Sequence, residues 1–198
     1  MPLAKSRDFN SIPTATGGIA RLALARLEEM GKDPIVGLSK VGLTVEEAQD
    51  PAIRLEVRTQ IKFLELAAEE VQDEWLGFHL ACNYDLREIG LVYYVIASSH
   101  HLADALRNAE RYSQINNEGV RLRFSLRGGI AAIALDYVDV DRRVDCHHIE
   151  FWLVTLLRSP YGSRHNTSEM EHLRNLERSS ASTSSLALTP TRYVFRNR

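Results

Sequence analysis

Apolar residues in the first part of the chain recur every three or four positions, which is the period of an amphipathic α-helix. One such stripe predicts a helix over residues 19–30, and Gly31 ends it because glycine is a poor helix former. Thr44 and Glu47 stand three residues apart before a short apolar step, the spacing of a capping box. The pattern therefore predicts at least two helices before residue 50.

The longest stripe runs over residues 53–68, with charged side chains largely off it. Asp50-Pro51 precedes it, and this pair is typical of a helix start, since aspartate caps and proline tolerates the first helical position. We therefore predict one long helix beginning at Pro51. A shorter helix follows from Asp73 to Leu80, and another amphipathic stripe predicts a helix over 99–112.

Residues 89–97 are apolar on nearly every side. Such a run is typical of an interior helix, although a short apolar run fits a buried strand equally well. We favour an interior helix.

The period changes to two after residue 119. Residues 120–127 alternate apolar and polar side chains, as does a half-buried strand. Gly128-Gly129 supplies a tight turn, because glycine reaches positive φ without a Cβ clash, and residues 130–137 return as a second strand. This segment predicts a β-hairpin.

The last apolar block lies in residues 144–158 and predicts a helix that is buried or packed on two sides; Pro160 stops it. Residues 159–198 are polar and serine-rich, so we expect a mobile or disturbed tail with a candidate strand at 191–195. The predicted class is α+β: a helical amino-terminal half, a β-hairpin, a buried helix and a terminal strand, with one domain over residues 1–158.

Composition adds a cellular setting. The chain has 198 residues, 44% of them hydrophobic and 25% charged, and a formal net charge of -2. These values predict a soluble globular protein without general attraction to nucleic acid or anionic membranes. The start has no signal-peptide core, no segment is apolar enough to span a membrane, and Cys82 and Cys146 fit no disulfide framework. We expect a cytoplasmic protein.

Catalytic chemistry finds little support. The run Asp145-Cys146-His147-His148 cannot converge on one ion, because neighbouring residues of a helix point about 100° apart. His148 and Trp152 do share a helix face. No serine–histidine–aspartate order, phosphate loop or zinc spacing is present. We predict neither an enzyme, nor a metal site, nor a cofactor.

Aromatic side chains are candidates for a ligand pocket, because they combine apolar area with a polar tip. Beside them, an arginine can hold a ligand carboxylate with two hydrogen bonds. Core packing remains the alternative for the aromatic residues, and a surface ion pair remains the alternative for the arginine. The candidate ligand-binding residues are Tyr93, Tyr94, Arg111, Tyr112 and Trp152.

A series of short motifs runs along the chain from Gly42 to Tyr112 in a fixed order. They are Gly42-Leu43, Asp50-Pro51 with Arg54, Leu64 with Ala67-Ala68, Leu76-Gly77 with Leu80-Ala81, Gly90-Leu91 with Tyr94, and Ser98 through Arg111-Tyr112. In this order and spacing, the chain from Leu22 to Leu157 resembles the amino-terminal regulatory domain of one branch of the AraC-type bacterial transcription regulators. Each motif is weak alone, and the series is specific.

The resemblance implies a domain that binds a small-molecule effector and mediates self-association, with homodimerisation as the expected partner interaction. It also implies that DNA is bound by a separate helix-turn-helix domain. That domain is absent from these 198 residues, so we expect a truncated or naturally shortened regulator that does not bind DNA directly. The alternative is a stand-alone interaction module that pairs with an intact regulator and inhibits it.

Overall fold

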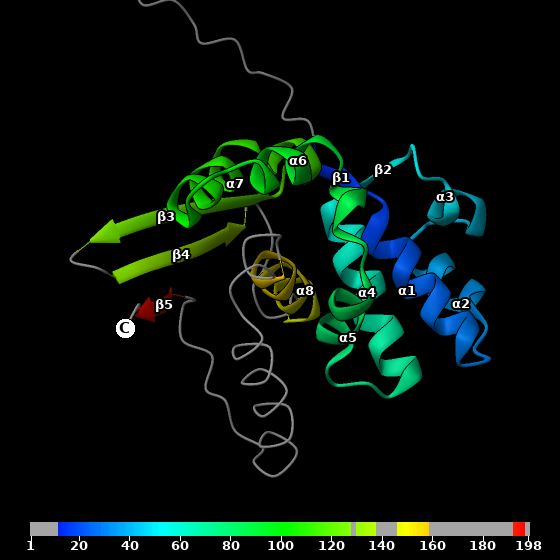
Figure 1. Cartoon of the computed structure of the whole chain (residues 1–198). Helices are drawn as coiled ribbons and strands as arrows, with labels where there is room; N and C mark the ends of the chain where they lie inside the picture. The colour runs from blue at the N-terminus through cyan, green and yellow to red at the C-terminus, as the bar shows by residue number, and fades with distance from the viewer. Residues whose placement is uncertain (1–11, 128–129, 138–145, 159–191, 197–198) are drawn as a thin grey trace, which may run out of the picture.

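The protein was studied as a computed structural model, which describes residues 12–127, 130–137, 146–158 and 192–196. Its elements belong to an α+β fold, as the sequence predicts, and the described residues form two large hydrophobic cores and one small third cluster. One core lies among the amino-terminal helices, and the other lies between three helices and a small antiparallel sheet (Figure 1).

The amino-terminal part contains four helices and a two-stranded sheet. The helices are α1 (Gly18–Glu29), α2 (Pro34–Lys40), α3 (Val45–Gln49) and α4 (Val57–Val71). The strands are β1 (Thr14–Thr16) and β2 (Arg54–Glu56), which pair antiparallel. The apolar stripes of α1 and α4 face each other, and their buried residues form the first core together with Leu38, Leu76 and Phe151. The capping box of Thr44 and Glu47 is confirmed at the start of α3.

The predicted start of the long helix was wrong. Residues 54–56 form β2, with Leu55 opposite Ala15 of β1, and the helix begins only at Val57. Asp50 does accept a backbone hydrogen bond, but from Ala52 across 2.8 Å in a turn rather than at a helix start. The strand partner lies about forty residues upstream in the chain, so a local pattern could not reveal it.

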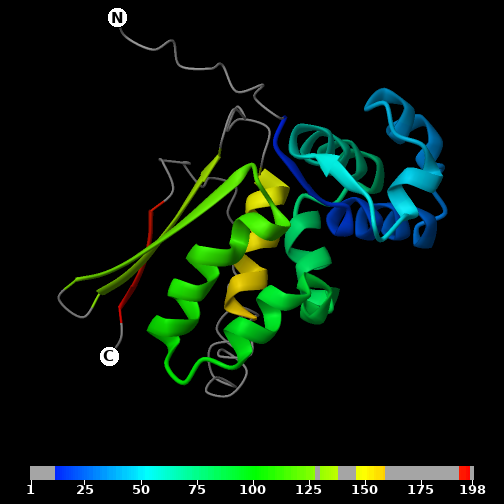
Figure 2. The ribbon, with the colours of Figure 1, turned by 90° about the horizontal axis from the view of Figure 1, so that it is seen from above.

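The second part consists of helices on one face of a three-stranded sheet. Strands β3 (Val120–Arg127), β4 (Ile130–Tyr137) and β5 (Arg192–Arg196) pair antiparallel in that order. The hairpin is confirmed, and β5 coincides with the terminal strand predicted at 191–195 apart from a shift of one residue. A 3-10 turn, η1 (Leu86–Ile89), leads into helices α6 (Leu91–Ala97) and α7 (Leu102–Asn116), which lie along the sheet (Figure 2).

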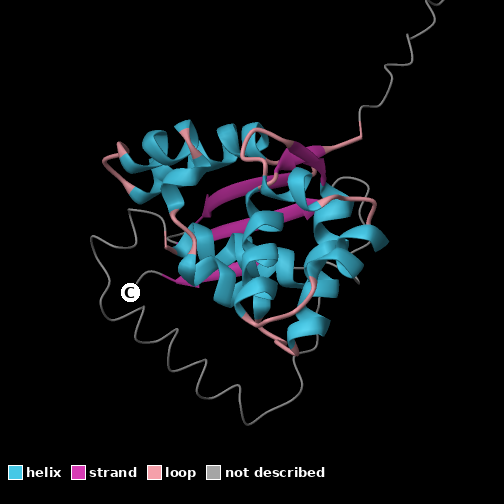
Figure 3. Cartoon of the chain, turned by 90° about the vertical axis from the view of Figure 1, so that its right-hand side faces the viewer, coloured by secondary structure: helices cyan, strands magenta, loops and turns pink. Residues whose placement is uncertain are grey.

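Helix α8 (Cys146–Leu157) stands between the two cores. Its Phe151 and Val154 are buried in the first core, Leu153 and Leu156 pack against the second, and Trp152 packs against both. Two-sided packing, predicted from its apolar sequence, is therefore confirmed. Figure 3 shows the larger sheet behind the helices when the molecule is viewed from the side of the amino-terminal helices.

Helix α5 (Leu76–Asn83) packs directly on α8. Gly77 makes this approach close, because a Cβ atom at this position would lie 2.7 Å from the carbonyl carbon of His147 and 2.8 Å from its Cα. A side chain larger than hydrogen has no room there. The glycine of the Leu-Gly motif is thus a contact surface between two helices.

Most of the apolar run at 89–97 forms a helix, as we predicted, but this helix is not an interior one. Gly90 has a φ of 66°, which divides the run into η1 and the seven-residue helix α6. Val92 and Ile96 are buried, but Leu91 is 70% exposed and Tyr94 is 59% exposed. The reason is that α6 lies at the edge of the second core and has α7 on one side only.

The tail predicted to be mobile falls mostly outside the described residues, as residues 159–191 are not among them. In the described part of the chain, no helix is long and apolar enough to cross a membrane.

Candidate functional site

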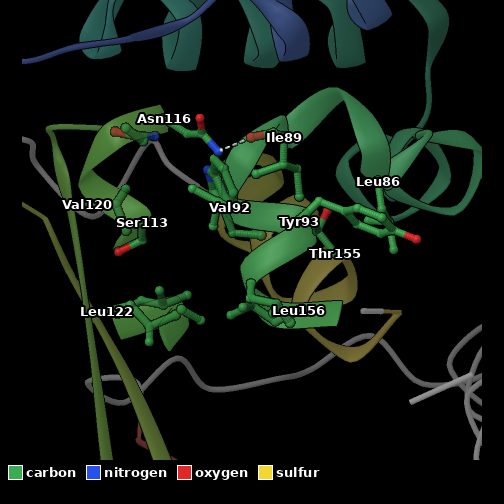
Figure 4. Close-up of a pocket in the computed structure, with 15 residues that line it drawn as sticks. Leu86, Ile89, Val92, Tyr93, Ser113, Asn116, Val120, Leu122, Thr155 and Leu156 are labelled. Carbon is green, nitrogen blue, oxygen red and sulfur yellow. Dashed lines mark hydrogen bonds between the residues drawn. The ribbon is translucent and has the colours of Figure 1, made fainter. Parts of the chain in front are cut away.

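A cavity lies where η1, α6, α7, the β3–β4 hairpin and α8 meet. Its empty volume, including the part that opens to solvent, is about 630 Å³. Figure 4 shows Ser113, Asn116, Val120 and Leu122 on one side, and Leu86, Tyr93 and Thr155 on the other. The described residues that line it are Leu86, Ile89, Val92, Tyr93, Ile96, Ala109, Ser113, Asn116, Asn117, Val120, Leu122, Leu135, Trp152, Thr155 and Leu156.

The secondary structure explains why these side chains converge. Val92 and Ile96 are four residues apart and share the buried face of α6. On β3, Val120 and Leu122 are two residues apart and point to the same face of the sheet, and Leu135 lies directly opposite Leu122 on β4. Each element therefore directs its apolar face into the same space.

Polar groups in the lining are mostly bonded to the protein. Asn116 donates from Nδ2 to the carbonyl oxygen of Ile89 over 3.0 Å, and Asn117 accepts at Oδ1 from the backbone N–H of Gly119 over 3.0 Å. Thr155 differs from them: it is 3% exposed, and its Oγ1 has no hydrogen-bond partner among the described residues. A buried hydroxyl without a partner is energetically costly, so Thr155 Oγ1 is a candidate contact for a ligand atom.

His148 does not line the cavity itself but contacts two residues that do, Trp152 and Asn117. Its Nε2 lies 3.2 Å from Nε1 of Trp152 and 3.5 Å from Nδ2 of Asn117. Indole N–H only donates, so Nε2 accepts, and the proton of the neutral ring sits on Nδ1, which faces the hydroxyl of Tyr137. Burial lowers the pKa of His148 to about 3. The neutral ring thus fixes the orientation of Trp152.

His147 belongs to a different cluster, between α8 and α4. Its Nδ1 lies 3.5 Å from Glu150 and its Nε2 lies 3.7 Å from Glu65. Burial lowers the pKa of His147, but the carboxylates of Glu150, Glu65 and Asp73 more than offset this, and the net pKa is raised. Among the residues that the structure describes, no group of three acidic, histidine or cysteine side chains is arranged to hold a metal ion.

The five residues predicted to bind ligand lie in different environments. Tyr93 and Trp152 line the cavity. Tyr94 and Arg111 are exposed, and the Arg111 guanidinium carbon stands 5.4 Å from the ring centre of Tyr112, which packs against the second core. For these three, a role in ligand binding stays a prediction that the cavity does not support.

Sequence reasoning missed Thr155 and the two asparagines. The only signal at Thr155 was a hydroxyl residue inside the apolar block of α8. Asn116 and Asn117 follow the last apolar position of the predicted 99–112 helix and were passed over as its end.

The comparison with known families decides the assignment. Residues 31–161, more than half of the chain, match the model of the arabinose-binding domain of AraC transcription regulator, N-term. The chain belongs to this family. No curated protein matches it. The match includes every element that lines the cavity, so the cavity lies within the AraC-type regulatory domain.

The structure also explains a motif of this AraC-type domain. Arg54 donates from Nε to Thr14 Oγ1 over 3.0 Å, from Nη2 to the Thr14 carbonyl oxygen over 3.1 Å, and from Nη1 to the Ile115 carbonyl oxygen over 3.0 Å. Glu118 completes the network by accepting from the N–H and the hydroxyl of Thr14, each over 2.9 Å. The arginine of the Asp-Pro motif therefore joins β1 to the end of α7.

Proposed function

We propose that this AraC-type regulatory domain senses a small-molecule effector in the cavity bounded by α6, α7, the hairpin and α8. The observation that carries the proposal is the unpartnered Thr155 hydroxyl within a mostly apolar lining. Ligand pockets commonly combine an apolar wall with a few placed polar groups. The family is one of regulatory rather than catalytic domains, and the lining residues that the structure describes include no nucleophile–base pair.

Helix α8 connects the cavity to the first core, because it contributes side chains to both. Trp152, Thr155 and Leu156 line the cavity, while Phe151 and Val154 on the same helix are buried in the first core. A ligand that shifts α8 therefore changes the packing of the amino-terminal helices. Self-association, delivery of the response by a DNA-binding domain and a cytoplasmic location stay predictions.

Thermal melting with small compounds of different charge and polarity tests the proposal. We expect at least one compound class to raise the melting temperature of the full chain. The variant Ser113→Phe fills the cavity from α7 and should abolish that rise. Gln114→Phe adds the same ring at the next, exposed position of α7 and serves as the matched control. Equal responses of the two variants, or no response of the wild type to any class, would contradict a sensing role for the cavity.

A further inference from the structure

The residues that the structure describes in the lining of the cavity bear no formal charge. Nine of its fifteen side chains are aliphatic, Tyr93 and Trp152 are aromatic, and the other four bear a hydroxyl or an amide. A carboxylate or ammonium group placed there would lose its hydration without gaining an opposite charge. The cavity therefore favours a neutral ligand.

The hydrogen-bonding capacity of the lining is also small. Nδ2 of Asn116, Oδ1 of Asn117, the hydroxyl of Ser113 and the indole N–H of Trp152 already bond to protein atoms. Thr155 Oγ1 is left as the fully buried side-chain oxygen of the lining without a partner in the described part of the chain. It matches one hydroxyl or carbonyl of a ligand.

A sugar does not fit these properties. A pentose has a hydroxyl on nearly every carbon atom, and each hydroxyl that is buried without a partner weakens binding. The lining does contain hydroxyl and amide side chains, but the nine aliphatic ones offer none of the required partners. The match to an arabinose-binding family therefore identifies the domain but not its ligand.

We infer that the effector is a neutral, mostly aliphatic molecule whose single hydroxyl or carbonyl group bonds to Thr155, and that pentose sugars are not bound. This inference rests on the proposed sensing function of the cavity. The aliphatic part of the ligand contacts the α6 and hairpin side chains, and Thr155 sets the direction in which the polar end points.

Fluorescence of Trp152 measures binding directly, since its ring lines the cavity. Trp75 is 44% exposed and is replaced in a Trp75→Phe background to leave one tryptophan signal. The probes are 1-octanol, which is neutral and aliphatic with one hydroxyl, octanoate, which adds a charge at the same length, and L-arabinose. We expect 1-octanol to change the fluorescence at the lowest concentration, and octanoate and arabinose to bind at least tenfold more weakly.

Variants at Thr155 test its role separately. Thr155→Val removes the hydroxyl at nearly constant shape and should weaken 1-octanol binding roughly three- to tenfold, while the free protein stays at least as stable as wild type. Thr155→Ser retains the hydroxyl and should bind within about twofold of wild type. Equal affinity of the valine variant and the wild type would overturn the role of Thr155.

The outcomes separate this inference from the proposed function. Arabinose or octanoate binding as tightly as 1-octanol, with loss of binding in Ser113→Phe, would overturn the ligand class and leave the sensing function in place. If no probe or compound shows binding that Ser113→Phe abolishes, both the ligand class and the sensing function are overturned.

Discussion

Replacing Gly77 with alanine tests the contact between α5 and α8, because two effects of opposite sign compete. In an exposed helix, alanine is more favourable than glycine by about 1 kcal/mol. At Gly77, however, the new Cβ would lie 2.7 Å from the carbonyl carbon and 2.8 Å from the Cα of His147, and closer still to its carbonyl oxygen. Carbon atoms pack at about 3.5–4.0 Å, so the helices must separate by roughly 1 Å.

The cost of that separation decides whether Gly77→Ala raises or lowers the free energy of unfolding. The crowded atoms are backbone, so no rotamer change relieves them, and over-packing of this kind costs about 1–3 kcal/mol or more. We expect a net loss of about 2 kcal/mol in the free energy of unfolding, a large part of the roughly 5–15 kcal/mol typical of a domain. Urea unfolding followed by circular dichroism measures this loss through the midpoint.

Gly37 in α2 provides the matched control. A Cβ there would lie 3.5 Å from Cε2 of Phe63, which is an ordinary contact. Gly37→Ala should therefore stabilise the protein by about 0.5–1 kcal/mol. A Gly77→Ala protein as stable as the wild type, or more stable, would refute the close packing of α5 on α8.

Other substitutions test separate parts of the structure. Arg54→Lys removes the planar fork that joins β1 to α7 and should destabilise the protein by about 1 kcal/mol in urea unfolding, whereas Arg107→Lys, with an exposed partner, should cost less than about 0.5 kcal/mol. Ile96→Asp should leave the domain largely unfolded in thermal melts, while Leu91→Asp, at an exposed site of the same helix, should melt close to wild type. Burial lowers the folded-state pKa of His148 to about 3, so between pH 6.5 and 3 the unfolded chain binds a proton that the folded protein does not. The free energy of unfolding therefore decreases as the pH is lowered through this range. His148→Gln should reduce this pH dependence by up to about 1.4 kcal/mol per pH unit, measured by urea unfolding from pH 7 to 5.

Local patterns predicted those parts of the fold whose period and end signals agree. The hairpin follows from alternation around Gly128-Gly129, and α8 from an apolar block too long for a strand. The β2 strand was missed because its pairing with β1 is a long-range contact that outweighs the helical period of residues 53–68. At α6, a run that is apolar on all sides carries no information about which side is covered, so the exposure of Leu91 could not be foreseen.

The candidate site was less accessible to prediction than the fold. The sequence predicts large aromatic side chains as ligand contacts, and two of them do line the cavity. Thr155 matters because its hydroxyl lacks a partner, and this property depends on the residues that surround it in space. No pattern along the chain encodes such a property.

The absence of a side chain at Gly77 has a mechanical consequence. At Gly77 the backbone of α5 lies directly against the backbone of α8, so no flexible side chain absorbs a displacement at this point. Arg158, at the end of α8, adds a second tie by donating to the carbonyl oxygens of Ala81 and Tyr84 at the end of α5. These two contacts favour movement of α5 together with α8, so we expect a shift of α8 at the cavity to displace α5 in the first core as well.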